Sequence, residues 1–170
     1  MPTHAIHLRL ARAPDARAIA AMSRDLIELG LGWKYDAAKV ARLIAEREVV
    51  TLVAMDRLGL VGFAILQFGD ERAHLVLLAV RPRCQRHGVA RRMMQWLFAS
   101  ARVAGMADIS LELRAGNQAA REFYRAMGFA DAGLVNHYYR EHEPALRMLH
   151  ILRRGNDHAP AWQPPTLKRH

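Results

Sequence analysis

Hydrophobic and polar positions alternate along parts of the chain, as is typical of β-strands. Seven segments show such strand patterns: 5–11, 48–55, 59–68, 72–80, 107–115, 129–139 and 145–152. The second and third flank the turn sequence DRLG and predict a hairpin. The run RAHLVLLAV, residues 72–80, is almost continuously apolar and therefore predicts a strand buried on both faces.

Elsewhere the apolar residues recur with helical spacing, and capping residues mark where the helices begin and end. Four helices are predicted: one opened by Pro14 and Asp15, one capped by Asp36 and ending near Ala45, one between Gly88 and Gly105, and one capped by Asn117 and closed by Gly128. In the first helix, the apolar face is predicted to hold Ala18, Ile19, Met22, Leu26 and Leu29.

Length and composition indicate one globular domain, since the chain has 170 residues, of which 52% are hydrophobic and 24% charged. We assign residues 1–154 to this domain and expect the Pro-rich tail, 155–170, to be disordered. The N-terminal segment lacks the continuous apolar core of a secretory signal, and no apolar run reaches the length of a membrane span. We therefore expect a cytoplasmic protein.

Cysteine and histidine usage argues against a metal site. Cys84 is the single cysteine, so an internal disulfide and a multi-cysteine zinc site are both excluded. The nine histidines show no spacing typical of metal ligands. We therefore predict that the protein needs no metal.

The chain is strongly basic, with 25 basic and 16 acidic residues and a formal net charge of +9. Such a charge favours polyanionic partners: nucleic acid, the ribosome or a phosphate-bearing cofactor. Because nearly all of the basic residues are arginine, the charge can equally reflect a compositional preference for that residue.

The segment RPRCQRHGVARR, residues 81–92, joins a predicted strand to a predicted helix. A helix N-terminus presents unpaired N–H groups and a partial positive charge, and Gly88 lets an anion approach the backbone. Arg86, Arg91 and Arg92 would add countercharge. The segment therefore fits a pyrophosphate site, although an exposed arginine-rich helix start that binds nothing fits these residues as well.

The order of these residues resembles the acetyl-coenzyme A signature of the GNAT acetyltransferase superfamily. The signature reads Gln or Arg, two residues, Gly, one residue, then Gly or Ala, and it stands here as Gln85, Gly88 and Ala90. The second half of the superfamily's core is matched by LELR, then Asn117, then Tyr124 seven residues later, then Gly-Phe. The resemblance covers about residues 5–152 and is strongest over 75–139.

Within the superfamily, the chain most resembles the ribosomal-protein alanine N-acetyltransferases, with which it shares the pair Tyr138–Tyr139. It departs from them in ELGLGWKYDAAKVARL, which lacks the pattern expected of their substrate loop. The resemblance implies an α+β fold: a mixed, mostly antiparallel, twisted sheet with helices on both faces. Two neighbouring parallel strands, ending near Val80 and Arg114, would part to hold acetyl-CoA.

The resemblance also assigns the residues that bind acetyl-CoA, which would act as co-substrate. The backbone of Leu78, Ala79 and Val80 would pair with the pantetheine arm, and a main-chain donor near Val80 would polarise the thioester oxygen. Asn117 would hydrogen-bond the cofactor or simply cap its helix. The pyrophosphate would lie against the loop and helix start made of Gln85, Arg86, His87, Gly88, Val89, Ala90 and Arg91.

Two catalytic residues follow from the same matching. Tyr124 would be the general acid that protonates the departing thiolate, whereas its place on an apolar helical stripe also fits a core residue. Glu112 would be the general base that takes a proton from the acceptor ammonium, although a strand glutamate more commonly forms a cross-strand ion pair.

The acceptor site is less clearly marked. Tyr138 and Tyr139 lie on opposite faces of a predicted strand, so one of them should face the acceptor. Trp33 and Tyr35 lie in a loop that could wall the same slot, while simple packing between two helices explains Trp33 equally well.

The predicted activity is direct transfer of the acetyl group of acetyl-CoA to a primary amine, foremost a protein N-terminal α-amine. A small-molecule amine is the alternative acceptor, and a non-catalytic module that binds acyl-CoA or RNA is the alternative class. The expected partners are the amine acceptor and the ribosome, with no membrane, and the protein would be a monomer or a homodimer.

Overall fold

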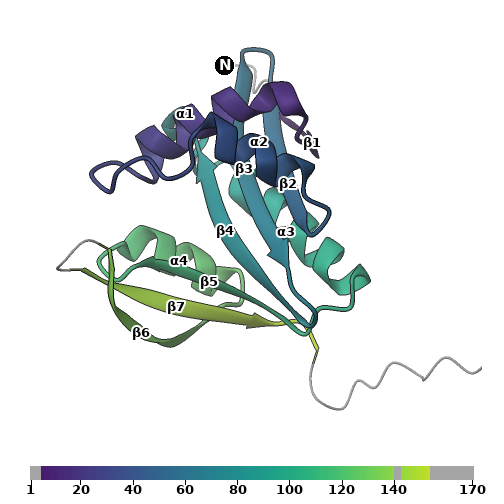
Figure 1. Ribbon diagram of the computed structural model, residues 1–170. Coiled ribbons are helices and arrows are strands. Elements are labelled where there is room, and N and C mark those ends of the chain that lie inside the picture. Colours follow the sequence, from purple (N-terminus) through teal and green to yellow (C-terminus); the bar gives the residue numbers. More distant parts are fainter. Residues whose placement is uncertain (1–4, 140–142, 154–170) are drawn as a thin grey trace, which may run out of the picture.

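The computed structural model describes residues 5–139 and 143–153 of the chain. In this part, seven strands form one twisted sheet in the order β1-β2-β3-β4-β5-β7-β6 (Figure 1). Neighbouring strands are antiparallel except for β4 and β5, which are parallel. The strands are β1 (His7–Leu10), β2 (Val49–Asp56), β3 (Gly59–Phe68), β4 (Arg72–Val80), β5 (Asp108–Arg114), β6 (Ala130–Tyr139) and β7 (Glu143–Ile151).

Helices cover both faces of the sheet. They are α1 (Ala16–Leu26), α2 (Ala37–Ala45), α3 (Val89–Val103) and α4 (Gln118–Ala126), with short 3-10 turns at Ala13–Asp15 and Pro82–Cys84. Helices α1 and α2 lie over one face of β2, β3 and β4, and α3 lies behind the same strands, whereas α4 lies beside β5 (Figure 1). The described residues thus form the predicted α+β fold, with a mostly antiparallel sheet and one parallel pair.

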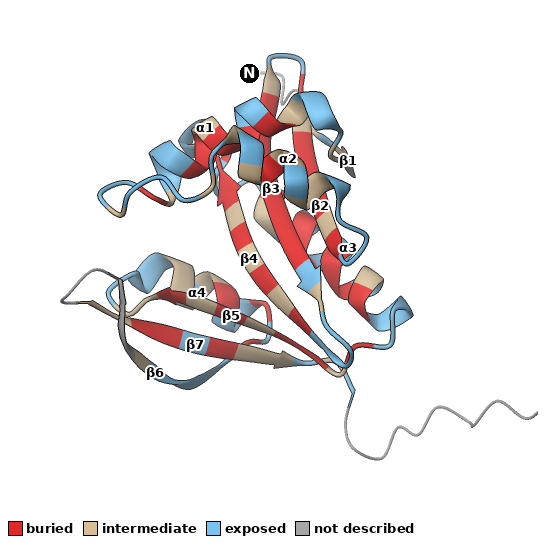
Figure 2. Ribbon diagram, in the orientation of Figure 1, coloured by how far each residue is buried: buried red, intermediate tan, exposed pale blue. Residues whose placement is uncertain are grey.

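The core consists of two layers, one on each side of the sheet. One contains side chains of α1 and α2, including Ile19 and Val40, and the other contains side chains of α3 and α4, including Met93 and Leu97. Strands β2 and β3 lie between both layers, so they are buried on both faces (Figure 2). They are therefore the strands with the longest buried runs.

Strand β4 is not buried on both faces, as its apolar sequence had predicted. From Ala73 to Leu78, buried residues alternate with half-buried ones, and the half-buried His74, Val76 and Leu78 line a cleft. The prediction failed because an apolar run indicates a buried strand only when a packed layer covers each of its faces.

The predicted helix ends are largely confirmed. The Asp36 carboxylate accepts a hydrogen bond from the Lys39 N–H at 2.9 Å and caps α2. The first helix ends earlier than its apolar spacing had predicted, because α1 stops at Leu26. Leu26 and Leu29 are therefore 39% and 72% exposed and line the cleft instead of the core.

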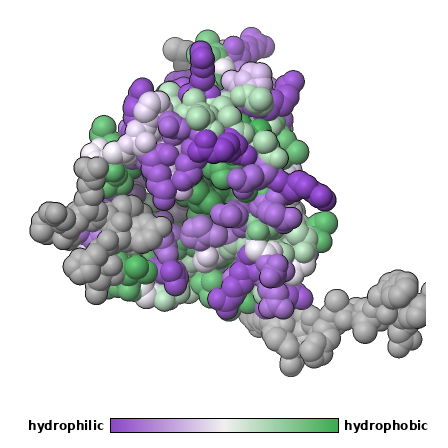
Figure 3. All heavy atoms as spheres, in the orientation of Figure 1, coloured by the Kyte–Doolittle hydropathy of each residue, from purple (hydrophilic) through white to green (hydrophobic). Residues whose placement is uncertain are grey.

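The surface of the described part carries hydrophilic and hydrophobic residues interspersed on the face seen in Figure 3. No helix in the described residues is long and apolar enough to cross a membrane. The predicted tail, 155–170, and the domain boundary before it lie outside the described residues.

Candidate active site

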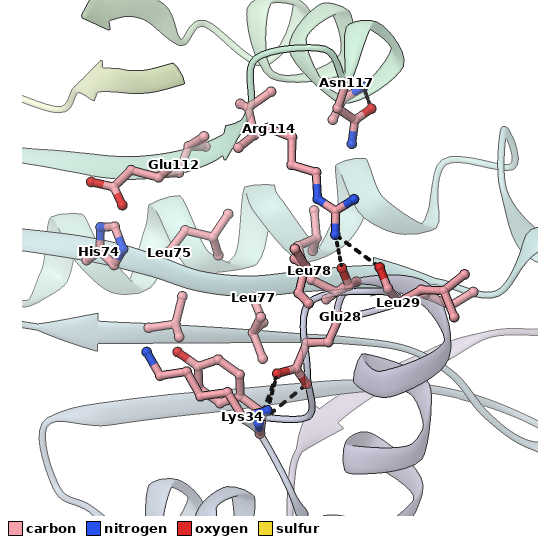
Figure 4. A pocket seen from close by; sticks show the side chains of 18 of the residues that line it. Glu28, Leu29, Lys34, His74, Leu75, Leu77, Leu78, Glu112, Arg114 and Asn117 are labelled. Atoms are coloured by element: carbon pink, nitrogen blue, oxygen red, sulfur yellow. Dashed lines mark hydrogen bonds between the residues drawn. The ribbon is translucent and has the colours of Figure 1, made fainter. Parts of the chain in front are cut away.

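A cleft of about 940 Å³ opens where the parallel strands β4 and β5 part. The two strands pair from Arg72 with Asp108 to Leu75 with Leu111, and beyond that pair they diverge. Strand β4 continues to pair with β3 as far as Val80, so in the described structure its other edge faces the cleft without a strand partner. Strands β4 and β5, α4 and the loop between α1 and α2 surround this space (Figure 4).

A β-bulge in β4 explains why the strands part at this place. Leu66 pairs with Leu75, while Ile65 pairs with Leu77, so Val76 is an extra residue on β4. The bulge reverses the alternation: Leu75 packs in the layer of α3, and Leu77 packs in the layer of α1 and α2. Because a bulge bends its strand and increases its twist, the second half of β4 turns away from β5.

The open end of β4 leads to the first turn of α3, where the sequence predicts the pyrophosphate site. Gly88 precedes this helix with φ of 78°, a left-handed conformation that glycine adopts without strain. A Cβ atom added to Gly88 would meet nothing within 4 Å, so the space above its backbone is open. The N–H groups of Val89, Ala90 and Arg91 have no acceptor within the helix, because they belong to its first turn. The start of α3 therefore fits a pyrophosphate group.

The five arginines of residues 81–92 have different roles in the structure. Three of them donate to other parts of the protein: Arg81 to the Leu60 carbonyl, Arg83 to Asp56, and Arg92 to the Ile6 carbonyl. The exposed Arg86 and Arg91 form no side-chain hydrogen bond or ion pair with the described residues. Among the three arginines predicted to add countercharge, Arg86 and Arg91 are thus without a side-chain partner in the described part, whereas Arg92 is held by the Ile6 carbonyl.

The remaining residues predicted to bind acetyl-CoA lie along the same path. Leu78 lines the cleft, whereas the side chains of Ala79 and Val80 are buried in the two core layers. Gln85 donates from Nε2 to the Val80 carbonyl at 3.0 Å, which ties the loop to the end of β4. The His87 side chain is exposed beside Gly88.

Helix α4 brings Asn117 and Tyr124 to the cleft. The Asn117 side-chain oxygen accepts from the Ala120 N–H at 3.2 Å, so this residue caps α4 and also lines the cleft. Tyr124 is 8% exposed and packs edge-on against Phe123 and Phe129, yet its side chain also lines the cleft. Burial raises the pKa of Tyr124, so its phenol stays protonated at neutral pH. Both predictions for Tyr124, core and cleft, are thus compatible.

Glu112 likewise combines its two predicted placements. It lies opposite Arg147 in the antiparallel register of β5 and β7, and the carboxylate oxygen is 2.7 Å from the guanidinium. Its side chain is 10% exposed and lines the cleft (Figure 4). Glu112 therefore forms the cross-strand ion pair and faces the site at the same time.

His74 is a cleft residue that the sequence analysis missed. It lies opposite Ser110 in the parallel register, and its Nδ1 is 2.9 Å from the Ser110 hydroxyl. Burial lowers the pKa of His74, with a further lowering from Arg147 and an opposing effect of Glu112. The available signal was a single polar residue within the apolar run 73–80, six residues before Val80.

The loop between α1 and α2 forms the opposite wall. Glu28, which is 7% exposed, accepts hydrogen bonds from the Ser23 hydroxyl and from the N–H groups of Lys34 and Tyr35 at 2.9, 2.6 and 3.1 Å. From the other side of the cleft, the Arg114 guanidinium donates to the Leu29 carbonyl at 3.2 Å (Figure 4). The loop is therefore fixed from both sides.

Trp33 lies outside the cleft. Its indole N–H donates to the Ala20 carbonyl at 3.2 Å, and the Arg24 guanidinium lies 5.3 Å from its ring centroid, so the side chain packs on α1. Tyr35 lines the cleft instead, between Lys34 and Lys39. The side chains of Tyr138 and Tyr139 in β6 lie outside the described residues.

No three His, Cys, Asp or Glu side chains lie close enough to hold a metal ion in the part of the chain that is described. The site consists instead of a free strand edge, a helix N-terminus at its open end, and acidic, basic and phenolic groups at its closed end. This arrangement agrees with the site that the GNAT resemblance of the sequence implies. The chain belongs to the acetyltransferase (GNAT) family, which residues 20–129 match.

Two curated relatives are ribosomal protein bS18-alanine N-acetyltransferases. The protein from Salmonella typhimurium is 36% identical over 100 residues, which make up 57% of this chain and 66% of that protein. The protein from Escherichia coli is 38% identical over 77 residues, which make up 45% and 52%. The matched part of the chain thus spans about half to two thirds of the length of these relatives.

The crystal structure of the ribosomal-protein-S18-alanine N-acetyltransferase from Escherichia coli has the same fold. It superposes with a TM-score of 0.78 over 90% of this chain and 97% of that chain, at 23% sequence identity. The superposition extends the likeness from the matched sequence segment to most of the domain.

Proposed function

We propose that this protein transfers the acetyl group of acetyl-CoA to the N-terminal α-amine of a protein. The observation that carries the proposal is the unpaired edge of β4, which runs from the open N-terminus of α3 into a cleft lined by Glu112 and Tyr124. The names of the two bS18-alanine N-acetyltransferases support the same class of acceptor.

In this proposal acetyl-CoA binds through the backbone. Its pyrophosphate accepts hydrogen bonds from N–H groups between Gln85 and Arg91, and Arg86 and Arg91 add positive charge. The pantetheine arm pairs with the backbone of Leu78, Ala79 and Val80 like an added strand. Asn117 donates from its side-chain nitrogen, because its oxygen already caps α4.

The chemistry is an attack of a neutral amine on the thioester carbon. A main-chain N–H on the cleft edge of β4, between Val76 and Val80, stabilises the negative charge that develops on the carbonyl oxygen. The nitrogen–carbon bond forms, the carbon–sulfur bond breaks, and Tyr124 gives its proton to the departing thiolate. Glu112 draws the ammonium to the closed end of the cleft and favours the removal of its proton. The products are the acetylated amine, free coenzyme A and one proton.

The charges of the cleft favour an α-amine over a polyamine. Asp25 pairs with Arg24, Glu28 binds its own loop, and Glu112 pairs with Arg147, so each carboxylate that lines the described cleft already has partners. Lys34 and Arg114 add positive charge to the same walls. A polyamine would bring several charges into this environment, whereas an α-amine titrates near pH 8 and brings one.

The predicted partners and surroundings follow from this acceptor. A ribosomal protein as acceptor would place the enzyme in the cytoplasm, and the net charge of +9 would favour association with ribosomal RNA. In this proposal residues 1–154 form the acetyltransferase domain and 155–170 a separate tail. Whether the protein acts as a monomer or a homodimer is a question for solution mass measurements.

The test is release of free thiol from acetyl-CoA with three acceptors and mass analysis of the products. The acceptors are a peptide with a free N-terminal alanine or serine, the same peptide N-blocked with an internal lysine, and spermidine. Turnover of the first peptide alone supports the proposal. Turnover of spermidine alone would assign a small-molecule acceptor, and salt-sensitive RNA binding without thiol release would assign a non-catalytic module.

A further inference from the structure

We propose that His74 is the group that receives the proton of the acceptor ammonium, with Glu112 as the charge that holds the ammonium beside it. This inference rests on the proposed function, because it assumes a primary amine as acceptor. It adds a catalytic residue from β4 to the two that the family resemblance places on β5 and α4.

His74 lies at the end of the cleft that the acetyl group would reach. His74 pairs with Ser110 one residue before Leu75 and Leu111, the last pair of the parallel ladder. It therefore lies at the closed end of the cleft, while the first turn of α3 lies at the open end beyond Val80. A thioester chain that enters from α3 along β4 points its acetyl group toward His74.

A hydrogen bond orients the imidazole of His74. His74 lines the cleft, and its Nδ1 is held at 2.9 Å from the Ser110 hydroxyl. A histidine whose Nδ1 donates to a neighbour carries its lone pair on Nε2, which is the form required of a proton acceptor. Ser110 thus holds the ring, and its hydroxyl can accept from Nδ1 in the tautomer that leaves the lone pair on Nε2.

Several charged and polar groups surround the ring of His74. Glu112 on β5 and Arg147 on β7 both act on His74, and the two are ion-paired with each other at 2.7 Å. Gln67 faces it from β3, and Lys34, Tyr35 and Glu28 face the same space from the loop between α1 and α2. Burial is the main reason that the pKa of His74 is lowered, so the ring is neutral and ready to accept a proton at neutral pH.

Glu112 and His74, the two candidate bases, differ in how readily each can take up a proton. The Glu112 carboxylate is engaged by the Arg147 guanidinium at 2.7 and 3.3 Å, which stabilises its ionised form. An imidazole also titrates closer to an α-ammonium than a carboxylic acid does, so proton transfer to it is less unfavourable. Glu112 is therefore better suited to attract the ammonium, and His74 to take its proton.

The protons balance as follows. One ammonium proton moves to Nε2 of His74, and the freed lone pair forms the nitrogen–carbon bond. The carbon–sulfur bond breaks and Tyr124 protonates the thiolate, after which the phenolate regains a proton from the newly acylated nitrogen. His74 then releases its proton to solvent, which is the one proton that the overall reaction produces.

The experiment measures kcat and KM for the α-amine peptide between pH 6 and 9.5 in the wild type, His74→Gln and Ser110→Ala. Glutamine retains a hydrogen bond to Ser110 but takes up no proton in this range. The matched control is His7→Gln, since His7 is exposed on β1 far along the chain from the cleft residues. Coenzyme A affinity and thermal unfolding are measured for every variant.

We expect His74→Gln to lower kcat/KM by about 100-fold at pH 7, the lower end of the range for general acid–base catalysis. The difference in kcat/KM between the wild type and His74→Gln should shrink above pH 8, because most of the α-amine is then already unprotonated in solution. Ser110→Ala should give a smaller loss with the same pH trend, and His7→Gln none. Coenzyme A affinity should stay unchanged in all variants.

A loss that is constant across the pH range, or one that appears in coenzyme A affinity, would overturn the role of His74 and leave it a packing residue. This failure is distinct from failure of the proposed function, which is decided by the wild type. A wild type that is active on spermidine alone would refute the acceptor, while the pH trend of His74→Gln on that amine would still decide the role of His74. A wild type inactive on every amine would overturn both.

Discussion

The two ends of the cleft are built in different ways. At the coenzyme A end, the features come from one short stretch, 85–91: a glycine, a helix start and two arginines with no partner among the described residues. At the acceptor end, the loop after α1 is held by Glu28 within it and by Arg114, which lies more than 80 residues further along the chain. The first end uses mainly backbone groups, and the second depends on side chains brought together by the fold.

This difference separates a general function from a specific one. Backbone N–H groups bind a phosphate whatever the neighbouring side chains are, so the coenzyme A end tolerates variation. The acceptor end takes its shape from a few long-range contacts, so small changes there alter which amine fits. Substitutions at the two ends should therefore change different kinetic constants.

The largest effect is expected at Tyr124, the proposed general acid. Tyr124→Phe removes the proton donor but keeps the ring packed against Phe123 and Phe129. We expect kcat to fall by about 100-fold or more, with coenzyme A affinity and acceptor KM within about twofold of the wild type. Stopped assays of thiol release and direct titration with coenzyme A measure the two quantities.

The pH profile gives a second check on Tyr124. Because burial raises its pKa, Tyr124 keeps its proton beyond the usual phenol value of about 10. The wild-type kcat should therefore show no alkaline decline from this group up to about pH 9.5. A decline with a midpoint below pH 9 that disappears in Tyr124→Phe would contradict this assignment.

An intermediate effect is expected at the acceptor end, from Glu28→Gln. The amide oxygen can still accept from Lys34 and Tyr35, but without the negative charge that strengthens both hydrogen bonds, and the amide nitrogen cannot accept from the Ser23 hydroxyl. Hydrogen bonds to a charged group contribute about 1.5–3 kcal/mol, so we expect acceptor KM to rise about tenfold. Coenzyme A affinity should not change.

The control for Glu28 is Glu46→Gln, which removes the same charge from an exposed position after α2. It should leave both constants unchanged. Equal KM values for Glu28→Gln and Glu46→Gln would show that the loop does not shape the acceptor site.

The smallest effect is expected at the coenzyme A end, from Gly88→Ala compared with Gly105→Ala. Both glycines flank α3 with φ of 78°, and an added Cβ would meet nothing within 4 Å at either position. Each substitution should therefore cost about 1–2 kcal/mol of stability. Coenzyme A affinity should fall about three- to fivefold in Gly88→Ala alone, because its methyl group occupies space that the phosphate needs.

Thermal unfolding and coenzyme A titration of the two variants make this comparison. Equal affinities in both would remove Gly88 from the phosphate site, whatever their stabilities.

The sequence predicted those features whose partners are close along the chain. The caps at Asp36 and Asn117 were predicted because each side chain binds an N–H three residues later. The sheet followed from alternation, and its parallel pair from the family resemblance. The fold and the coenzyme A site were predicted from these elements.

The features that were missed depend on partners far away in sequence. The role of His74 depends on Ser110 and Glu112 on another strand, and the role of Arg114 depends on its hydrogen bond to the loop after α1. For Trp33 the sequence left open whether it walls the acceptor slot or packs against a helix, and its hydrogen bond to the Ala20 carbonyl on α1 agrees with packing. Spacing along the chain contains no information about such contacts, so only the fold reveals them.

The extra residue in β4 has a consequence for how this strand can vary. Residues before Val76 and residues after it follow opposite alternations, so the side chains of the two halves are out of phase by one residue. Deleting Val76 would bring the two halves into phase: Leu77 and Ala79 would stay on the side of α1 and α2, and the bend that opens the cleft would be lost. Deleting a residue after Val76 would instead keep the bulge and turn the side chains that follow the deletion to the opposite layers. The length of this strand should accordingly be more constrained than its composition.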